Sequence, residues 1–213
     1  MKKYFLGLAV VFVLSNCLYA QETKSKDEFG IYIKCGLSHD YQFKLNTTLA
    51  NIGCKKTPDI LTFGGLGFYY GIKKVEITLD GGIGGLYDKN TRLINWVANV
   101  SVGYKLTLPK DHSLIFSGNI AHTAYNIFTY VEKGNLDFEN STLTNSTMFH
   151  LELQQLMAGP RITWRHDMFD IGIGYDFGCI PFRLKSNNVN LSNSPKERID
   201  RIYFDLKFIF LKH

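Results

Sequence analysis

The sequence predicts an all-β fold, an eight-stranded antiparallel up-and-down transmembrane β-barrel, and three observations predict it. Eight segments alternate apolar and polar residues with period two, which is typical of strands and not of helices. These segments have the length of a tilted transmembrane strand, about nine residues or more, whereas strands of soluble proteins average about five or six. Beyond the N-terminal region no run of about eighteen apolar residues occurs, so the sequence predicts no transmembrane helix.

The N-terminal region has the pattern of a secretory signal peptide. Lys2 and Lys3 form a positively charged start, and an apolar stretch over residues 6–14 follows that is too short to span a bilayer. The small residue Ala20 then precedes the polar Gln21. We therefore expect export and cleavage after Ala20.

The alternative to this cleavage is a lipoprotein signal with Cys17 as the lipidated residue. Asn16 disfavours it, because a small residue is usual at that position. We expect residues 1–20 to be removed, residues 21–28 to form a short periplasmic N-terminal segment, and residues 29–213 to form the barrel. Cleavage takes away two lysines and lowers the formal charge from +5 to +3. This small excess is not the concentrated basic patch that nucleic-acid binding needs.

The first four predicted strands cover residues 29–38, 60–72, 75–87 and 93–106. One face of these strands carries apolar side chains, as in Phe29, Ile31, Ile33, Cys35, Leu37, Leu79, Trp96, Val100 and Val102. The other face carries small and polar side chains, as in Lys34, Ser38, Glu76, Thr78, Asp80, Asn95, Asn99, Ser101 and Lys105. In a membrane barrel the apolar face contacts lipid and the polar face lines the interior.

The other four predicted strands cover residues 113–128, 149–164, 169–177 and 202–210. The last two alternate most regularly, with the polar residues Asp170, Asp176, Asp205 and Lys207 between apolar neighbours. In the segment 149–164 the apolar period slips near Gln154 and Gln155. We interpret this slip as a β-bulge.

Short and long connections alternate along the chain. Three are short: residues 73–74, 109–112 and 166–168. Three are long and polar: residues 39–59, 129–148 and 186–199. This alternation is typical of an outer-membrane barrel with turns in the periplasm and loops outside, and an even number of strands leaves both termini in the periplasm. The alternative, a soluble lipocalin-like barrel or sandwich, would carry a charged outer face instead.

On this pattern the chain, from about Phe29 to its end, resembles the small OmpA/OmpX-like outer-membrane β-barrel proteins, often labelled porin-family. The resemblance implies a Gram-negative cell envelope, a monomer, contact with outer-membrane lipid and lipopolysaccharide, and insertion by the outer-membrane assembly machinery. Such barrels usually end on an aromatic residue. Here Phe208 and Phe210 supply the aromatic pattern, but residues 211–213 follow, so the recognition signal is displaced.

Charged residues on the polar faces are expected to pair across the interior, because an unpaired buried charge is costly. The expected network consists of Lys34, Glu76, Asp80, Lys105, Glu152, Arg161, Asp170, Asp176, Asp205 and Lys207. The leading interpretation is structural, with the network in place of a hydrophobic core. The protein would then have a structural or surface-interaction role through its long extracellular loops. The alternative is a narrow passive channel for small solutes.

A third possibility is an enzyme that acts on lipid. The triplet His122, Thr123 and Ala124 loosely resembles the lipid A deacylases, which pair a histidine with a serine on the lipid-facing surface. Here Ala124 stands where the nucleophile belongs, and Thr123 points to the opposite face. His150 and Glu152 share a face and could form a base with its orienting carboxylate, but no nucleophile completes the pattern. We therefore expect no enzymatic activity.

Three cysteines remain after cleavage: Cys35, Cys54 and Cys179. In a closed barrel the last strand separates Cys35 from Cys179, so two intervals of about 4.8 Å exceed the roughly 7 Å limit for a disulfide. Free thiols are expected, with a bridge from Cys54 to either strand as the alternative. No metal-ligand spacing, phosphate loop or dinucleotide pattern occurs, so no metal or cofactor is expected.

Overall fold

The structure, a computed structural model, describes residues 27–41, 46–47, 51, 59–87, 91–130, 136–137, 142–143, 148–180, 182–186, 191–192 and 196–212. Its long strands close into a barrel in the order β1-β13-β9-β8-β5-β4-β3-β2. They are β1 (Glu28–Tyr41), β2 (Ile60–Ile72), β3 (Val75–Tyr87), β4 (Thr91–Thr107), β5 (His112–Tyr130), β8 (Met148–His166), β9 (Phe169–Gly178) and β13 (Asp200–Lys212). The predicted eight-stranded barrel is confirmed.

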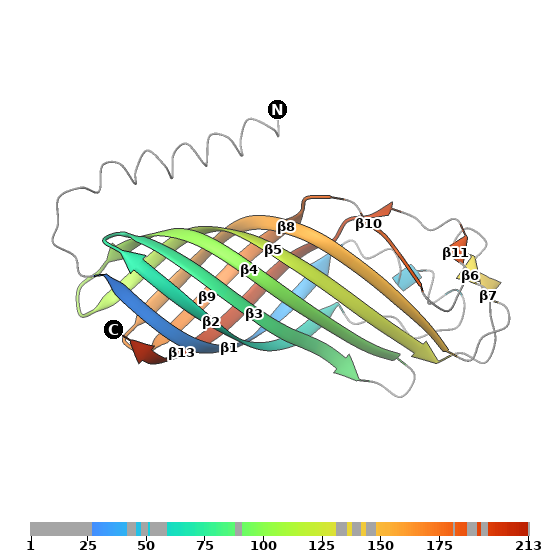
Figure 1. Cartoon of the computed structure of the whole chain (residues 1–213), viewed down its shortest axis with the longest axis horizontal. Coiled ribbons are helices and arrows are strands. Elements are labelled where there is room, and N and C mark those ends of the chain that lie inside the picture. The colour runs from blue at the N-terminus through green and yellow to red at the C-terminus, as the bar shows by residue number, and fades with distance from the viewer. Residues whose placement is uncertain are drawn as a thin grey trace, which may run out of the picture.

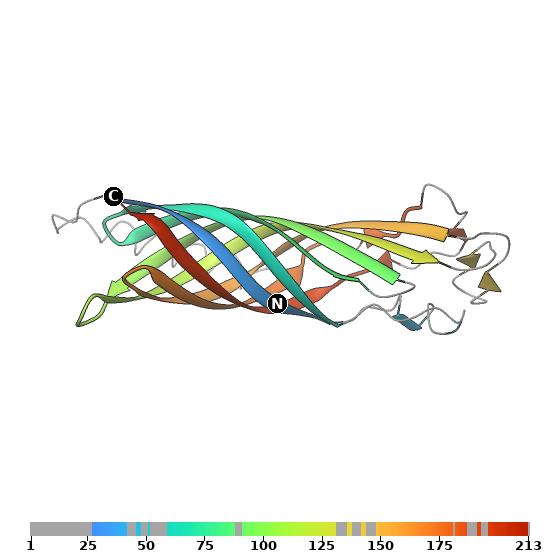
Figure 2. The same cartoon turned by 90° about the horizontal axis from the view of Figure 1, so that it is seen from below.

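All neighbouring strands of the barrel are antiparallel. The strands are steeply tilted, and the C-terminus lies at the same end as the β2–β3, β4–β5 and β8–β9 turns (Figures 1 and 2). Lys73, Lys110, Asp111 and Asp167 in these turns have positive φ angles between 50° and 61°. Such angles close short antiparallel connections without splaying the strands. We call the opposite end of the barrel the outer end.

Alternation along each strand separates two surfaces. Ile33, Leu66 and Ile83 point outward and are 49%, 62% and 67% exposed, whereas Tyr32 and Tyr69 point inward and are fully buried. A continuous exposed apolar belt with a polar interior is the inverse of a soluble barrel and requires lipid around it. None of the described helical residues belongs to a helix long and apolar enough to cross a membrane.

Two strands, β5 and β8, extend well beyond the others at the outer end. β5 and β8 each have 19 residues, whereas β9 has 10 and pairs with β8 only from Met157 onward. Residues 122–130 of β5 and 148–156 of β8 therefore extend past the end of β9, and residues 91–96 of β4 pair with β5 beside them (Figures 1 and 2). We call these three segments the outer sheet; residues 92–96 also pair with residues 83–87 of β3 on their other side.

Short strands occur in the segments that connect the barrel strands at the outer end. β6 (Leu136–Asp137), β7 (Thr142–Leu143) and β11 (Leu191–Ser192) form one small sheet, and β10 (Phe182–Arg183) pairs with β12 (Lys196–Glu197). Lys185 exchanges two backbone hydrogen bonds with Glu152, at 2.8 and 2.9 Å. Lys185, in the β9–β13 connection, thus pairs with the part of β8 that extends past β9.

The β-bulge expected at Gln154 and Gln155 is absent. β8 pairs with β5 in one unbroken register over the whole length of both strands. Leu151 and Leu153 consequently point inward and are buried. The apparent slip arises because the filling of the barrel changes from polar to apolar at the outer end, while the backbone keeps its phase. A register shift lies elsewhere, beside Ile31 where β1 pairs with β13.

The domain boundaries expected from the sequence are described only in part. The predicted signal peptide, residues 1–20, and residues 21–26 lie outside the described residues. Glu28, placed in the N-terminal segment by the sequence, is the first residue of β1.

Candidate functional site

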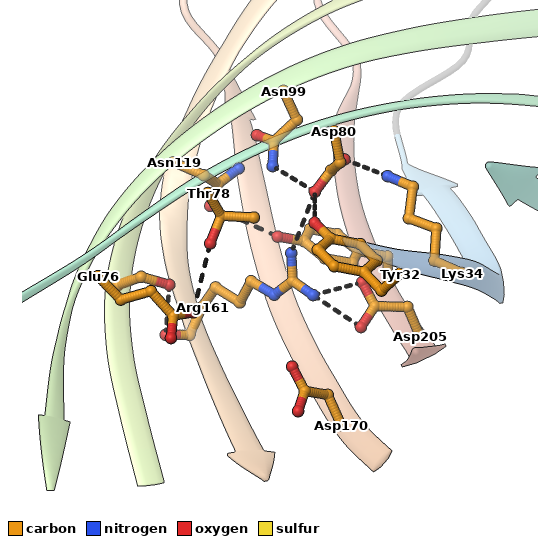
Figure 3. A network of polar contacts seen from close by, with 12 residues as sticks. Tyr32, Lys34, Glu76, Thr78, Asp80, Asn99, Asn119, Arg161, Asp170 and Asp205 are labelled. Carbon is orange, nitrogen blue, oxygen red and sulfur yellow. Dashed lines mark hydrogen bonds and ion pairs between the residues drawn. The ribbon is translucent and has the colours of Figure 1, made fainter. Parts of the chain in front are cut away.

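The centre of the interior is an ion-pair network around Arg161 of β8. Arg161 donates two hydrogen bonds to the carboxylate of Asp205 on β13, at 2.8 and 2.7 Å, and its other terminal nitrogen lies 3.9 Å from Asp80 on β3. Asp80 also forms an ion pair with Lys34 and accepts a hydrogen bond of 3.0 Å from the Tyr32 hydroxyl. The network joins β1, β3, β8 and β13 across the barrel (Figure 3).

A second group, nearer the short turns, is organised by Arg165. Its guanidinium donates two hydrogen bonds of 2.8 Å to Asp170 and two, of 2.6 and 3.2 Å, to Glu76. The same guanidinium lies 4.0 Å from the centre of the Tyr69 ring, within cation–π distance. Arg165 is 2% exposed, so its two carboxylate partners neutralise a charge that has lost its water.

A third group lies towards the outer end. Arg201 of β13 forms an ion pair with Asp176 of β9, and Asn119 of β5 donates a hydrogen bond of 2.6 Å to the same carboxylate. The Arg201 guanidinium also lies 5.2 Å from the centre of the Tyr203 ring. Each group therefore links strands that are distant in the sequence.

Nine of the ten charges expected in the interior lie there or at its rim. Eight are buried: Lys34, Glu76, Asp80, Arg161, Asp170, Asp176, Asp205 and Lys207. Lys105 forms an ion pair of 2.7 Å with Glu28 at the rim near the short turns. Glu152 is a correction: with no bulge in β8, it points to the outside of the barrel, opposite to Leu151 and Leu153.

Two central residues, Arg165 and Arg201, were missed by the sequence reasoning. Arg165 continues the inward alternation of Arg161 and Thr163, and Arg201 continues that of Tyr203. The predicted strands ended one residue before Arg165 and began one residue after Arg201. Extending the period-two pattern by one step at each strand would have found both.

Two small cavities near Arg161 lie among the interior side chains that the structure describes. One of about 30 Å³ is lined by Lys34, Asp80 and Arg201, and one of about 10 Å³ is lined by Glu76 and Lys207. A buried water needs about 10–15 Å³, so the first holds about two waters and the second at most one. Arg161 lines both cavities.

The inner face of the outer sheet is mostly apolar. Its inward side chains include Leu93, Ile127, Leu151 and Leu153, each no more than 2% exposed. The Gln155 side chain fastens this sheet to the β9–β13 connection.

Gln155 donates a hydrogen bond of 2.6 Å to the Ile199 carbonyl and accepts one of 3.0 Å from the Ile199 N–H. The outer sheet is thus a packed element, held on its inner side.

The histidines considered for catalysis both lie on the outward face. His122 stands beside Trp96, with 5.1 Å between ring centres, while the Thr123 side chain is turned into the barrel and buried. His150 Nε2 lies 3.1 Å from the amide oxygen of Asn126 and 3.8 Å from the Glu152 carboxylate. These contacts hold the His150 ring in place.

Cys35 and Cys179 are free thiols and exposed. β13 lies between β1 and β9, as the disulfide argument requires. Cys54 lies outside the described residues, so its state stays a prediction. Among the described residues, no group of three or more His, Cys, Asp or Glu side chains is placed to hold a metal ion.

The closed eight-stranded barrel, its apolar outer surface and its ion-paired interior define the class: the chain has the fold of the small outer-membrane β-barrels. Neisserial surface protein A aligns with a TM-score of 0.50 at 9% sequence identity, over 87% of this chain and 100% of its own. Ail, the attachment invasion locus protein of Yersinia pestis, aligns with a TM-score of 0.46 at 12% identity, over 87% and 100%. The N-terminal β-barrel domain of Pseudomonas aeruginosa OprF aligns with a TM-score of 0.40 at 10% identity, over 84% and 97%.

No protein-family model and no curated protein matches the sequence. The identities to the solved structures are low, so the likeness concerns the fold alone. The resemblance to small outer-membrane barrels that the sequence suggested is confirmed at this level, and function has to be argued from the site.

Proposed function

We propose that this protein is a non-enzymatic outer-membrane barrel with a structural interior and an outer end that takes part in interactions at the cell surface. One observation carries the proposal: ion pairs around Arg161, Arg165 and Arg201 cross the interior below the outer sheet. Among the described residues, the two interior cavities near Arg161 hold only a few waters, and Arg161, held by Asp205, lines both of them. A solute could pass only if this buried pair separated, which is costly.

The outer sheet supports the second half of the proposal. It extends beyond the rest of the barrel, its interior is packed, and Gln155 ties it to the β9–β13 connection. A rigid surface of this kind costs little conformational entropy when it binds a partner. The residue Ala124, two positions after His122, supports the absence of a catalytic role.

The orientation of the barrel in the membrane follows from the difference between its two ends, with short turns at one end and the outer sheet at the other. We propose that the end with the short turns, where β1 begins and β13 ends, faces the periplasm and that the outer end faces the outside. In this orientation the C-terminal aromatic pattern with Phe208 and Phe210 meets the assembly machinery, and the outer end meets lipopolysaccharide. We further propose that the barrel is a monomer, because the strands close on each other and leave no barrel edge to pair.

Planar-bilayer recording of the purified protein tests this proposal. The expected result is silence from protein whose folding is verified by a heat-dependent shift in gel mobility. Reproducible unitary current steps from the same preparation would overturn the structural interpretation and favour the narrow channel. Light scattering of the detergent complex checks the monomer.

A further inference from the structure

Two histidines are neighbours on the outward face of the barrel, at the end with the short turns. β5 begins at His112 and β8 ends at His166, and these two residues stand directly opposite each other in the register of the strands. The His112 carbonyl accepts a hydrogen bond from the Leu108 N–H, so it faces the β4 side and not β8. His112 and His166 therefore form a pair without backbone hydrogen bonds between them. In such pairs the Cα atoms lie about 4.5 Å apart and the side chains come closest.

The side chains of His112 and His166, which we call the histidine pair, lie against each other. Their ring centres are 4.2 Å apart, with an interplanar angle of 29°. Trp164, two residues before His166 on the same face, lies 5.4 Å from the His112 ring and 6.0 Å from the His166 ring. Three rings from two neighbouring strands thus form one cluster, and strand pairing fixes their spacing.

One nitrogen of the histidine pair needs a partner. His112 Nδ1 is buried and has no hydrogen-bond partner among the described residues. A buried polar atom without a partner is costly, and most such atoms in proteins are satisfied. His166, in contrast, is exposed to its surroundings. The pair therefore combines an unsatisfied nitrogen with a side from which a ligand can enter.

The spacing of the rings suits two nitrogens that share one metal ion. Neutral imidazole is a common ligand of Zn²⁺, Cu²⁺ and Ni²⁺. Two nitrogens that each bind one zinc ion at about 2.0–2.1 Å lie about 3 Å from each other. Rings with centres 4.2 Å apart can reach this separation by rotation about the Cβ–Cγ bond, a torsion with broad minima in histidine. The strands do not have to move.

The charges next to the histidine pair permit a cation. Asp111 and Asp167 adjoin the two histidines in the β4–β5 and β8–β9 turns, and both are exposed. Lys110 is the basic residue of these turns, so two carboxylates stand against one ammonium group. A metal ion bound by the pair would therefore meet no excess of positive charge from the turns.

We propose that His112 and His166 together bind a divalent transition-metal ion that prefers imidazole, such as Cu²⁺ or Zn²⁺. Within the part of the chain that the structure describes, no third His, Cys, Asp or Glu joins them in a metal-binding group, so water fills the remaining coordination positions. Open positions make this an exchangeable site and not a closed structural one. The inference is independent of the proposed function, because it concerns the end of the barrel opposite to the outer sheet.

The test uses the full mature protein without an affinity tag, in detergent micelles, so that metal reaches both ends of the barrel. Trp96→Phe serves as background, because it leaves Trp164 as the single tryptophan. Cupric chloride is titrated while the Trp164 emission is recorded, since Cu²⁺ quenches a fluorophore close to it. The expected result is quenching that saturates at equimolar metal, reverses with EDTA and is opposed by zinc chloride.

Variants that keep the stacked rings locate the ligands. His112→Phe and His166→Phe each preserve an aromatic ring and remove the nitrogens of one histidine. Each is expected to weaken Cu²⁺ binding about a hundredfold, because the second of two linked ligands acts at a high effective concentration. His150→Phe is the matched control, because His150 also stacks on a ring, that of Phe128, but in the outer sheet. It is expected to leave the quenching of Trp164 unchanged.

Electron paramagnetic resonance of the Cu²⁺ complex reports the ligands directly. Nitrogen couplings from two imidazoles are expected in the parent protein, and from one in each of the two variants. Unchanged quenching in His112→Phe and His166→Phe would overturn the inference, and the three rings would then be an aromatic stack only.

Quenching that never saturates, or a spectrum without imidazole couplings, would overturn the inference as well, because Cu²⁺ would then bind the N-terminal amine or scattered carboxylates. Should His112→Phe not fold, the exposed His166 remains, and His166→Phe decides the question alone.

Discussion

Removal of Arg161 is expected to be the most damaging change to a single interior charge. The Arg161 and Asp205 side chains are 3% and 2% exposed and are joined by hydrogen bonds of 2.8 and 2.7 Å. Arg161→Ala leaves the Asp205 carboxylate buried without its partner, and breaking a buried pair in this way costs about 3–5 kcal/mol. Asp80 is less affected, because Lys34 still pairs with it.

The double variant Arg161→Met with Asp205→Leu separates the two contributions to this loss. It removes both charges and keeps most of the volume, so the desolvation penalty disappears together with the attraction. We expect it to be more stable than Arg161→Ala, by about 2 kcal/mol or more, since apolar replacement of a buried pair is often neutral or stabilising.

Urea unfolding in phospholipid vesicles, followed by tryptophan fluorescence and gel mobility, measures both free energies by linear extrapolation. The reasoning fails if Arg161→Ala costs less than about 1 kcal/mol, well below the range for a broken buried pair. It also fails if the double variant is as unstable as the two single variants added together, because the interior would then not depend on pairing.

The remaining predictions concern the wall of the barrel. A Cβ at Gly159 would lie 1.7 Å from a backbone carbonyl oxygen of β9, so Gly159→Ala should cost about 1–3 kcal/mol in the same urea titration, whereas Gly118→Ala, with nothing within 4 Å, should be neutral. Leu79, 43% exposed to lipid, should cost about 2–4 kcal/mol when changed to Arg, and a loss below about 0.5 kcal/mol would mean that it does not face the bilayer midplane. In a Cys54→Ser background, a water-soluble maleimide should label Cys179 and spare Cys35 in intact vesicles, as mass spectrometry can show. Burial raises the pKa of the Cys179 thiol, so its labelling should accelerate as the pH rises; equal labelling of both cysteines would contradict the lipid-facing position of Cys35.

Much of the barrel wall was predictable because the residues of most strands alternate between apolar side chains that face outward and polar side chains that face inward. The bounds of β2 and β3 agree with the predicted residues 60–72 and 75–87. The prediction was less good at β5 and β8, which are longer than expected, since the inward side chains of their outer parts are mostly apolar and the contrast between the two faces is lost there. In the outer part of β8 the apolar side chains of Leu151 and Leu153 point inward, so the alternation of apolar residues in the sequence shifts by one position although the strand register does not.

The sequence by itself determined the number of strands, their lipid-facing sides and most of the charges that enter the barrel. These are local properties, because the period-two alternation and the strand length depend only on residues that are close together in the sequence. The tertiary structure alone decided the partners: Arg161 meets Asp205 and Arg165 meets Glu76 across separations of 44 and 89 residues. Such pairs depend on strand register and closure, which place residues of distant strands at one height and bring their side chains across a narrow interior. A list of inward-facing charges shows which groups need partners, and only the closed barrel shows which partner each of them has.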